Sequence, residues 1–173
     1  MPQVLVARRI LALGTFAALA ACGGGDSPDT AADTPATTDT PAPATATASE
    51  GERLYATCVA CHQTNGQGMP GAFPPLAGSE WVTGSPDRLI AILVHGMQGP
   101  VTVAGTEYNG VMLPYGVGVE MSDSDLATLL TYVRSSWGNS ASAISAADVA
   151  RVKTATADRT TAWTAAELMA AMP

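Results

Sequence analysis

The chain has 173 residues and a formal net charge of −7. That length allows one modest domain with appended segments. The acidic balance argues against nucleic acid as a partner and favours a basic surface on any charged partner. Only 5% of the residues are aromatic, so the chain by itself supplies little flat apolar bulk for a core.

The N-terminal segment, residues 1–21, has the pattern of an export signal. Arg8 and Arg9 form a charged front, and the apolar run that follows ends in small residues. This run is too short for a transmembrane helix, which needs about 20 apolar residues. We therefore expect residues 1–21 to direct export and to be removed.

The end of this signal carries a more specific pattern. Leu19, Ala20, Ala21 and Cys22 follow one another, which resembles the lipobox of bacterial lipoproteins. The resemblance implies cleavage before Cys22, a diacylglycerol on its thiol and acylation of the new N-terminus. Several acyl chains exceed the two signals that stable membrane anchoring needs. The alternative is an ordinary secreted protein whose cleavage site happens to precede a cysteine.

Residues 22–49 comprise this cysteine and the low-complexity segment that follows it, residues 23–49. Three glycines lead into loosely repeated Asp, Thr, Ala and Pro. Such residues bury little apolar area, so the segment is predicted to be disordered or partly polyproline-like. It would serve as a tether between the lipid and a folded domain.

The stretch at residues 58–62 combines two cysteines with a histidine. Cys58, Cys61 and His62 have the spacing of the c-type haem attachment signature. On one helical turn the thiols can reach the two vinyl groups on one porphyrin edge, while His62 places a nitrogen under the iron. One alternative is a thioredoxin-like redox pair, but no βαβ pattern surrounds the motif. Another is half of a zinc site, for which only His95 and Cys22 remain as further ligands.

A helix is predicted over residues 51–58, and it delivers the motif at its C-terminal end. Gly51 and Tyr55 lie on this helix, and Leu129 and Tyr132 lie on a later one. On these positions and the motif, residues 50–138 resemble a class I cytochrome c of the small bacterial kind. The resemblance implies an all-α, cytochrome c-like helical domain wrapped around one covalently attached haem c. In that family a small residue such as Gly51 lets the two helices cross closely.

The loop at residues 63–78 is rich in glycine and proline, which excludes a long helix or a central strand. It can therefore lie close against a face of the cofactor. A metal-bound imidazole almost always donates its other N–H to an oxygen acceptor. The resemblance implies a proline carbonyl in this role. Pro75 matches best by spacing, and Pro74 is the rival.

The next helix is predicted over residues 86–95. Ser85 provides its cap, Pro86 fits its first turn, and Gly96 ends it. The run is so apolar that we expect it to be buried on most faces. His95 and Met97 lie at its exit, and either could in principle bind iron. His95 fits better as a helix-terminal histidine.

Residues 99–118 are again rich in glycine and are predicted to be mainly loop. Residues 101–103 and 107–108 allow a small hairpin. Asn109 and Gly110 form a turn signal. Gly110 and Gly116 would make the loop adaptable.

The family resemblance implies a methionine of such a loop as the sixth iron ligand, and Met112 is our candidate. Met69 follows His62 too closely to reach the opposite face of the porphyrin easily. Met169 and Met172 lie in the C-terminal tail, which the family domain does not need. Met121 directly precedes the cap of the last domain helix, where an apolar staple residue is expected. One feature departs from the family pattern, because Leu113 stands where related sequences often place a proline directly after the ligand.

Three capped helices are predicted toward the C-terminus: one over residues 123–137, one over residues 146–158, and a short final helix that begins after Thr164. Residues 139–173 extend beyond what the compact family domain needs. We expect this extension to pack on the domain surface or to be partly mobile. The caps are Ser122, Ser145 and Thr164.

These features together predict a lipid-anchored mono-haem cytochrome c on the periplasmic side of a bacterial membrane. Gly23 follows Cys22 in place of an aspartate retention signal, which favours the outer membrane. The protein would carry single electrons between redox proteins and would act on no small molecule, because two strong ligands leave no open iron position. The alternatives are a haem subunit of a larger oxidoreductase, and a haem enzyme or gas sensor with a labile sixth ligand.

Replacing the lipobox cysteine tests the predicted anchor. Cys22→Ser removes the thiol that would carry the diacylglycerol, so we expect either a soluble form or an uncleaved precursor. Membrane fractionation of cells that produce each form measures this. A soluble wild-type protein would contradict the anchor.

Overall fold

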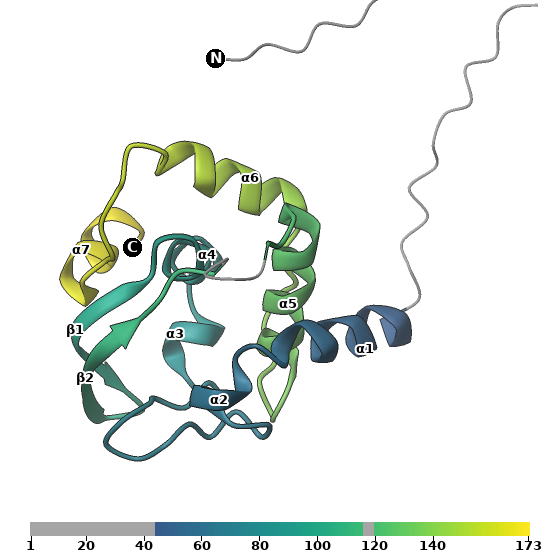
Figure 1. Ribbon diagram of the computed structural model, residues 1–173, viewed down its shortest axis with the longest axis horizontal. Helices are drawn as coiled ribbons and strands as arrows, with labels where there is room; N and C mark the ends of the chain where they lie inside the picture. The colour runs from purple at the N-terminus through teal and green to yellow at the C-terminus, as the bar shows by residue number, and fades with distance from the viewer. Residues whose placement is uncertain (1–43, 116–119) are drawn as a thin grey trace, which may run out of the picture. The chain divides into compact units, whose positions relative to one another are not determined.

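The computed structural model describes residues 44–115 and 120–173. These residues form a helical domain with one two-stranded sheet (Figure 1), which confirms the predicted cytochrome c-like helical fold. The sheet contains the small hairpin predicted from residues 101–103 and 107–108, and it is longer than predicted. The predicted signal, Cys22 and Gly116 lie outside the described residues. In chain order the elements are α1 (Ala44–Tyr55), α2 (Val59–His62), α3 (Glu80–Thr83), α4 (Pro86–His95), β1 (Met97–Val103), β2 (Thr106–Met112), α5 (Asp123–Ser135), α6 (Ala146–Ala155) and α7 (Ala165–Ala171).

The first helix begins earlier than the sequence predicts. We expected unstructured chain as far as Ser49, whereas α1 begins at Ala44. Extending an existing helix costs far less than nucleating one, and alanine is the best helix former. Once residues near Gly51 pack against α5, the helix can therefore continue backward into the low-complexity segment. None of the helices in the described ranges is long and apolar enough to cross a membrane.

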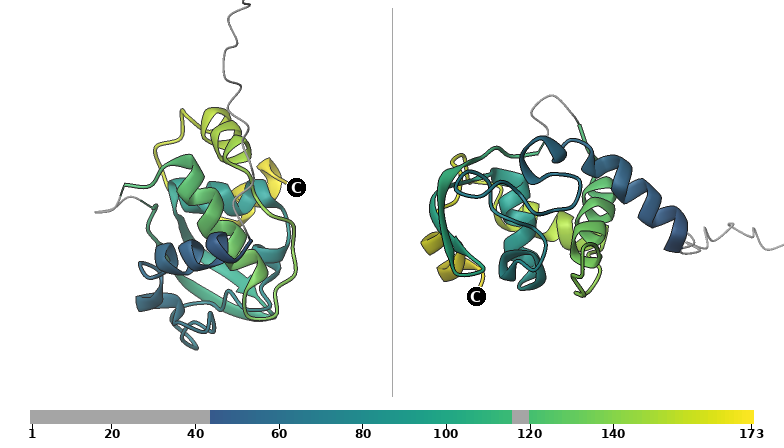
Figure 2. Two further views of the ribbon diagram at one scale, coloured as in Figure 1. Left: turned by 90° about the vertical axis from the view of Figure 1, so that its right-hand side faces the viewer. Right: turned by 90° about the horizontal axis from the view of Figure 1, so that it is seen from below.

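Helices α1 and α5 cross closely at Gly51 (Figure 2), as the sequence predicts. A Cβ placed on Gly51 would overlap the Tyr132 Cβ and lie 3.2 Å from the Thr128 carbonyl oxygen. Beside the crossing, the Tyr55 and Tyr132 rings lie 5.8 Å apart between centroids. The absence of a side chain at Gly51 therefore sets the distance between the two helices.

The sheet is an antiparallel hairpin in which Met97 pairs with Met112 and Val103 pairs with Thr106. Its turn is formed by Ala104 and Gly105, which both have positive φ. Our prediction of a turn at Asn109 and Gly110 was wrong, because both lie inside β2. The observed register places alternate apolar residues of both strands on one buried face, and this burial outweighs the local turn preference.

The C-terminal extension packs against the domain. Figure 1 shows α6 lying across α4 and α5, and α7 lying beside β1. Val149 and Leu168 are fully buried, and Trp163 is 7% exposed. Residues 139–173 therefore share the hydrophobic core with the rest of the described domain. Helix α6 ends at Ala155, three residues before the predicted end.

A buried arginine, which the sequence analysis did not single out, ties this extension to the core. Arg134 on α5 is 2% exposed. Its guanidinium donates to the carbonyl oxygens of Val82 at 2.6 Å, Gly84 at 3.0 Å and Ser142 at 2.7 Å. Burial lowers the pKa of Arg134. On a helix whose buried positions are leucines and valines, an arginine is expected to be exposed. Its burial could not be predicted from the sequence, because only the tertiary structure brings these carbonyl groups around it.

The helix crossing predicts whether Gly51→Ala stabilises or destabilises the protein. Helix propensity alone would make Gly51→Ala stabilising by about 1 kcal/mol. Because the new Cβ would overlap Tyr132, we expect destabilisation by about 1–3 kcal/mol instead. Denaturant unfolding of the haem-loaded protein measures this. Glu52→Ala, at an exposed neighbouring position of α1, is the control and should change stability by less than about 0.5 kcal/mol; a stabilising Gly51→Ala would contradict the close crossing.

Candidate functional site

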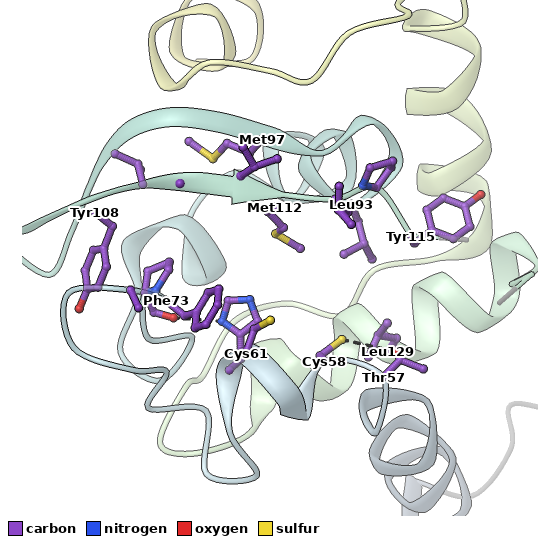
Figure 3. Close-up of a pocket in the computed structure, with 18 of the residues that line it drawn as sticks. Thr57, Cys58, Cys61, Phe73, Leu93, Met97, Tyr108, Met112, Tyr115 and Leu129 are labelled. Carbon is purple, nitrogen blue, oxygen red and sulfur yellow. Dashed lines mark hydrogen bonds between the residues drawn. The ribbon is translucent and has the colours of Figure 1, made fainter. Parts of the chain in front are cut away.

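A cavity of about 430 Å³ lies between the α2 region and the inner face of the hairpin (Figure 3). A second cavity of about 90 Å³ adjoins it. A cavity of this size with mainly apolar walls is typical of a cofactor site. The residues that line both cavities are Cys58, His62, Pro74, Leu93, Met97, Val101, Met112 and Leu129.

The motif at residues 58–62 forms one wall of the larger cavity. Cys58 caps the single turn of α2, and the His62 backbone N–H donates to the Cys58 carbonyl at 2.9 Å. Figure 3 shows Cys58 and Cys61 on the same side of the cavity, and both thiols are free. Burial raises the pKa of the Cys58 thiol. This shift argues against a thioredoxin-like pair, whose reactive cysteine needs a lowered pKa.

His62 is held by the loop that follows it. Its side chain is 8% exposed, and Nδ1 donates to the Pro74 carbonyl at 3.0 Å when it carries the proton. Burial lowers the pKa of His62, which keeps the imidazole neutral. The other nitrogen, Nε2, then has a free lone pair, which is the state that a metal ligand requires.

The acceptor for His62 is Pro74, and not Pro75, which was our first choice. Adjacent carbonyls of an extended chain point in different directions, so only one of two neighbouring prolines can face the imidazole. Gly68 selects the register, because its N–H donates to the His62 carbonyl at 3.0 Å. A Cβ on Gly68 would also overlap the backbone of Phe73 and Pro74. Residue spacing alone could not distinguish the two carbonyls.

The hairpin forms the opposite wall. Gly99 and Gly110 face each other across the strands. A Cβ added to either glycine would meet no atom within 4 Å. Glycine inside a strand often marks a place where a ligand approaches the backbone closely. The paired glycines therefore leave room for a flat group against the sheet, between Tyr108 on one side and Met112 on the other. From the sequence both glycines are predicted as loop or turn residues, and that pattern does not indicate this role. In the structure, residues 97–103 alternate in burial as a strand does.

Three of the candidate sixth ligands line the cavity, namely Met97, Met112 and Met121. Figure 3 shows the Met112 side chain reaching from the end of β2 into the cavity, toward the side that carries Cys58 and Cys61. Met112 ends a paired strand, so our expectation of a free loop at this position was wrong.

The remaining candidates lie elsewhere. Met69 and Met169 are 43% and 53% exposed. His95 forms a hydrogen bond between Nε2 and the Thr156 Oγ1 at 2.7 Å, and it does not line the cavity. The site therefore fits a haem that is attached at Cys58 and Cys61 and held by His62, with a methionine on the far side.

Comparison with known proteins agrees with this geometry. The sequence model of the family described as "Cytochrome c" matches residues 48–137, so the chain belongs to the cytochrome c family. It is a class I mono-haem cytochrome c whose cofactor is one covalently attached haem c.

Two kinds of relative are similar to this chain. Cytochrome c-552 of Thermus thermophilus is 43% identical over 94 residues, which cover 52% of this chain and 70% of that protein. The cytochrome c subunit of the quinone alcohol dehydrogenase of Gluconacetobacter polyoxogenes is 34% identical over 98 residues, which cover 56% of this chain. The fructose dehydrogenase cytochrome subunit of Gluconobacter japonicus is 32% identical over 112 residues, which cover 60% of this chain. The chain spans 20% and 22% of these two dehydrogenase subunits.

Filling the space beside the paired glycines tests the wall of the site. Gly110→Leu places a branched side chain where the cofactor would lie, so we expect less covalent haem per protein and a loss of stability of about 1–3 kcal/mol. Haem-stained denaturing gels, compared with total protein, measure the loading. Thr102→Leu, at an exposed position of β1, is the control and should load normally. Full loading of Gly110→Leu would show that the haem does not lie against this part of the sheet.

Proposed function

We propose that this cytochrome c is a lipid-anchored carrier of single electrons on the periplasmic side of a bacterial membrane, with Met112 as the sixth iron ligand. The observation that carries the proposal is one apolar cavity with Cys58, Cys61 and His62 on one wall and Met112 on the other. Bound haem supplies reversible one-electron exchange at its iron.

The described residues divide the remaining work. Pro74 fixes the tautomer and the orientation of His62 through its carbonyl. Apolar side chains such as Leu93 and Leu129 exclude water from the cavity. A histidine and methionine pair raises the potential relative to two histidines. Because both axial positions would be filled by protein, no position remains for a substrate, which supports a carrier and not an enzyme.

The rim of the cavity supports transient docking. Val111 and Leu113 flank Met112, and they are 65% and 63% exposed. Both line the larger cavity. An apolar rim of this kind suits the small, short-lived interfaces of electron-transfer partners. The donor and the acceptor would be redox proteins that approach this rim.

The sequence at Cys22 supports the membrane tether. A lipid on this residue, followed by residues 23–43, would hold the domain at a membrane surface while it meets its partners. Gly23 favours the outer membrane, as argued above.

A second candidate function is that of a haem subunit in a larger dehydrogenase. Its support is the similarity to the cytochrome c subunits of alcohol and fructose dehydrogenases. Purification from detergent-solubilised membranes distinguishes the two candidates. A stable dehydrogenase that co-purifies in fixed proportion supports the subunit, and a haem protein that elutes alone supports the mobile carrier.

Met112→Ala tests the assigned ligand. We expect the long-wavelength band of methionine-bound ferric iron to disappear, the potential to fall, and the ferrous protein to bind carbon monoxide. The physical reason is that alanine has no donor atom and leaves one axial position open. Optical spectra with a redox titration and a carbon monoxide titration measure all three changes.

Met97→Ala and Met121→Ala are the matched controls, because both residues line the same cavity. Each should keep the methionine band. If Met112→Ala kept the band while one of these variants lost it, the ligand assignment would be wrong and the family assignment would stand. If the ferrous wild-type protein binds carbon monoxide readily, the gas-sensor or enzyme alternative would be favoured.

A further inference from the structure

The C-terminal extension reaches the segment that carries Met112, although the match to the cytochrome c family ends at residue 137. Two separate parts of the extension make this contact. One part pairs with the edge of β1 that does not face β2, and the other contacts the Tyr115 ring just after β2.

The first contact is a short backbone pairing at Trp163. Its N–H donates to the Gly96 carbonyl at 3.0 Å, and its carbonyl accepts from the Gln98 N–H at 2.8 Å. These two bonds bracket Met97, which is itself paired with Met112. The extension thus adds a third backbone segment to the hairpin at the level of Met112.

The Trp163 side chain is fixed in turn. The Arg159 guanidinium lies 3.4 Å from the centre of its ring. Arg159 also donates to Glu167 at 2.8 Å, which joins this residue to α7. Trp163 is 7% exposed, and Arg159 stacks on its ring. Burial and stacking therefore both fix the side chain of the residue that pairs with β1.

The second contact is made by Lys153, the single lysine of the chain. Its ammonium donates to Asp123 at the start of α5 at 2.7 Å. It also lies 6.0 Å from the centre of the Tyr115 ring, within the range of a cation–π contact. The contacts with Asp123 and then Tyr115 raise the pKa of Lys153, so its charge is retained.

Tyr115 lies three residues after Met112 and lines the same cavity. Its N–H donates to the Leu93 carbonyl of α4 at 2.8 Å. On the other side of the same segment, a Cβ on Gly96 would lie 2.5 Å from the Met112 carbonyl oxygen. The segment from Met112 to Tyr115 is therefore packed against the end of α4, and Lys153 contacts it at the Tyr115 ring.

Helix α6 offers a firm base for this cover. Thr156 at its C-terminal end is joined to His95 of α4 by the 2.7 Å hydrogen bond described above. Val149 and Val152 bury its inner face. The lysine thus extends from a helix that is fixed to the same element against which the Met112 segment rests.

We propose that the C-terminal extension is a brace that holds Met112 in position toward the haem, with Lys153 and Trp163 as its positioning residues. The proposal rests on the proposed role of Met112 as a ligand. A thioether is an uncharged ligand that exogenous ligands can displace. Anything that restrains the backbone of residues 112–115 therefore lowers the affinity of a competing ligand.

Competition by imidazole tests the brace in the full-length, haem-loaded ferric protein. Lys153→Met keeps the apolar stem and removes the ammonium, so it breaks the contacts with Asp123 and Tyr115 together. We expect its association constant for imidazole to rise about three- to tenfold, the effect of losing one partly exposed ion pair and one cation–π contact. Lys153→Arg keeps the charge and should restore most of the wild-type value.

Arg151→Met is the matched control. Arg151 lies on the same helix, and its replacement removes ion pairs to Asp87 on α4 at 2.7 Å and to Asp148 at 3.3 Å. Neither pair involves residues 112–115. The imidazole affinity of this variant should stay within about twofold of the wild type, a change of less than about 0.5 kcal/mol. Thermal unfolding of all the variants separates ligand displacement from general loss of stability.

The outcomes separate the brace from the proposed function. Equal affinities in Lys153→Met and the wild type would overturn the brace, and so would equal rises in Lys153→Met and Arg151→Met. Either result leaves the ligand assignment intact if Met112→Ala loses the methionine band. Retention of that band in Met112→Ala would instead overturn the proposed ligand, whatever the lysine variants do.

Discussion

The close crossing of α1 and α5 is the constraint on which the rest of the site depends. Since α1 leads directly into the motif, the distance between these helices at Gly51 determines where Cys58, Cys61 and His62 lie relative to the core. Tyr55 on α1 and Leu129 on α5 then form part of the floor beneath the motif. A larger residue at the crossing would move one whole wall of the cavity, because a one-turn helix such as α2 has little packing of its own.

The opposite wall obeys a different rule. A strand pair exposes alternate residues on one face, so a one-residue change of register would replace the glycines that face the cavity by neighbours that carry side chains. The buried residues of the hairpin, Met97, Val103 and Tyr108, prevent such a slip. The cavity is therefore enclosed by a helical wall set by close approach and a sheet wall set by register.

The C-terminal extension changes how this small domain is stabilised. A domain of this size buries a limited fraction of its surface. The extension contributes Ile144, Val149, Val152 and Leu168 to the same core, and Arg134 satisfies carbonyl groups on both sides of the junction. A prosthetic group that must be kept dry, and a ligand that must be kept in place, both gain from this second layer of packing over the hairpin and α4.

The sequence by itself determined the local features of this protein. The attachment motif and the capped starts of α5 to α7 could be identified because each depends on neighbours within a few residues. The glycine at the helix crossing was identified through the family resemblance, because its partner on α5 is distant in the chain. Ser85 lies at the predicted start of α4, but its side chain forms no cap hydrogen bond. Tertiary structure alone decided which proline carbonyl faces His62, that Asn109 and Gly110 lie in a strand, and that Arg134 is buried. Each of these depends on contacts that the local sequence pattern does not specify. Gly68 turns the loop under the imidazole, strand pairing overrides a turn preference, and carbonyls of residues 82, 84 and 142 converge on one guanidinium. Contacts between distant residues are not encoded in local spacing, because many chain paths are compatible with the same short patterns.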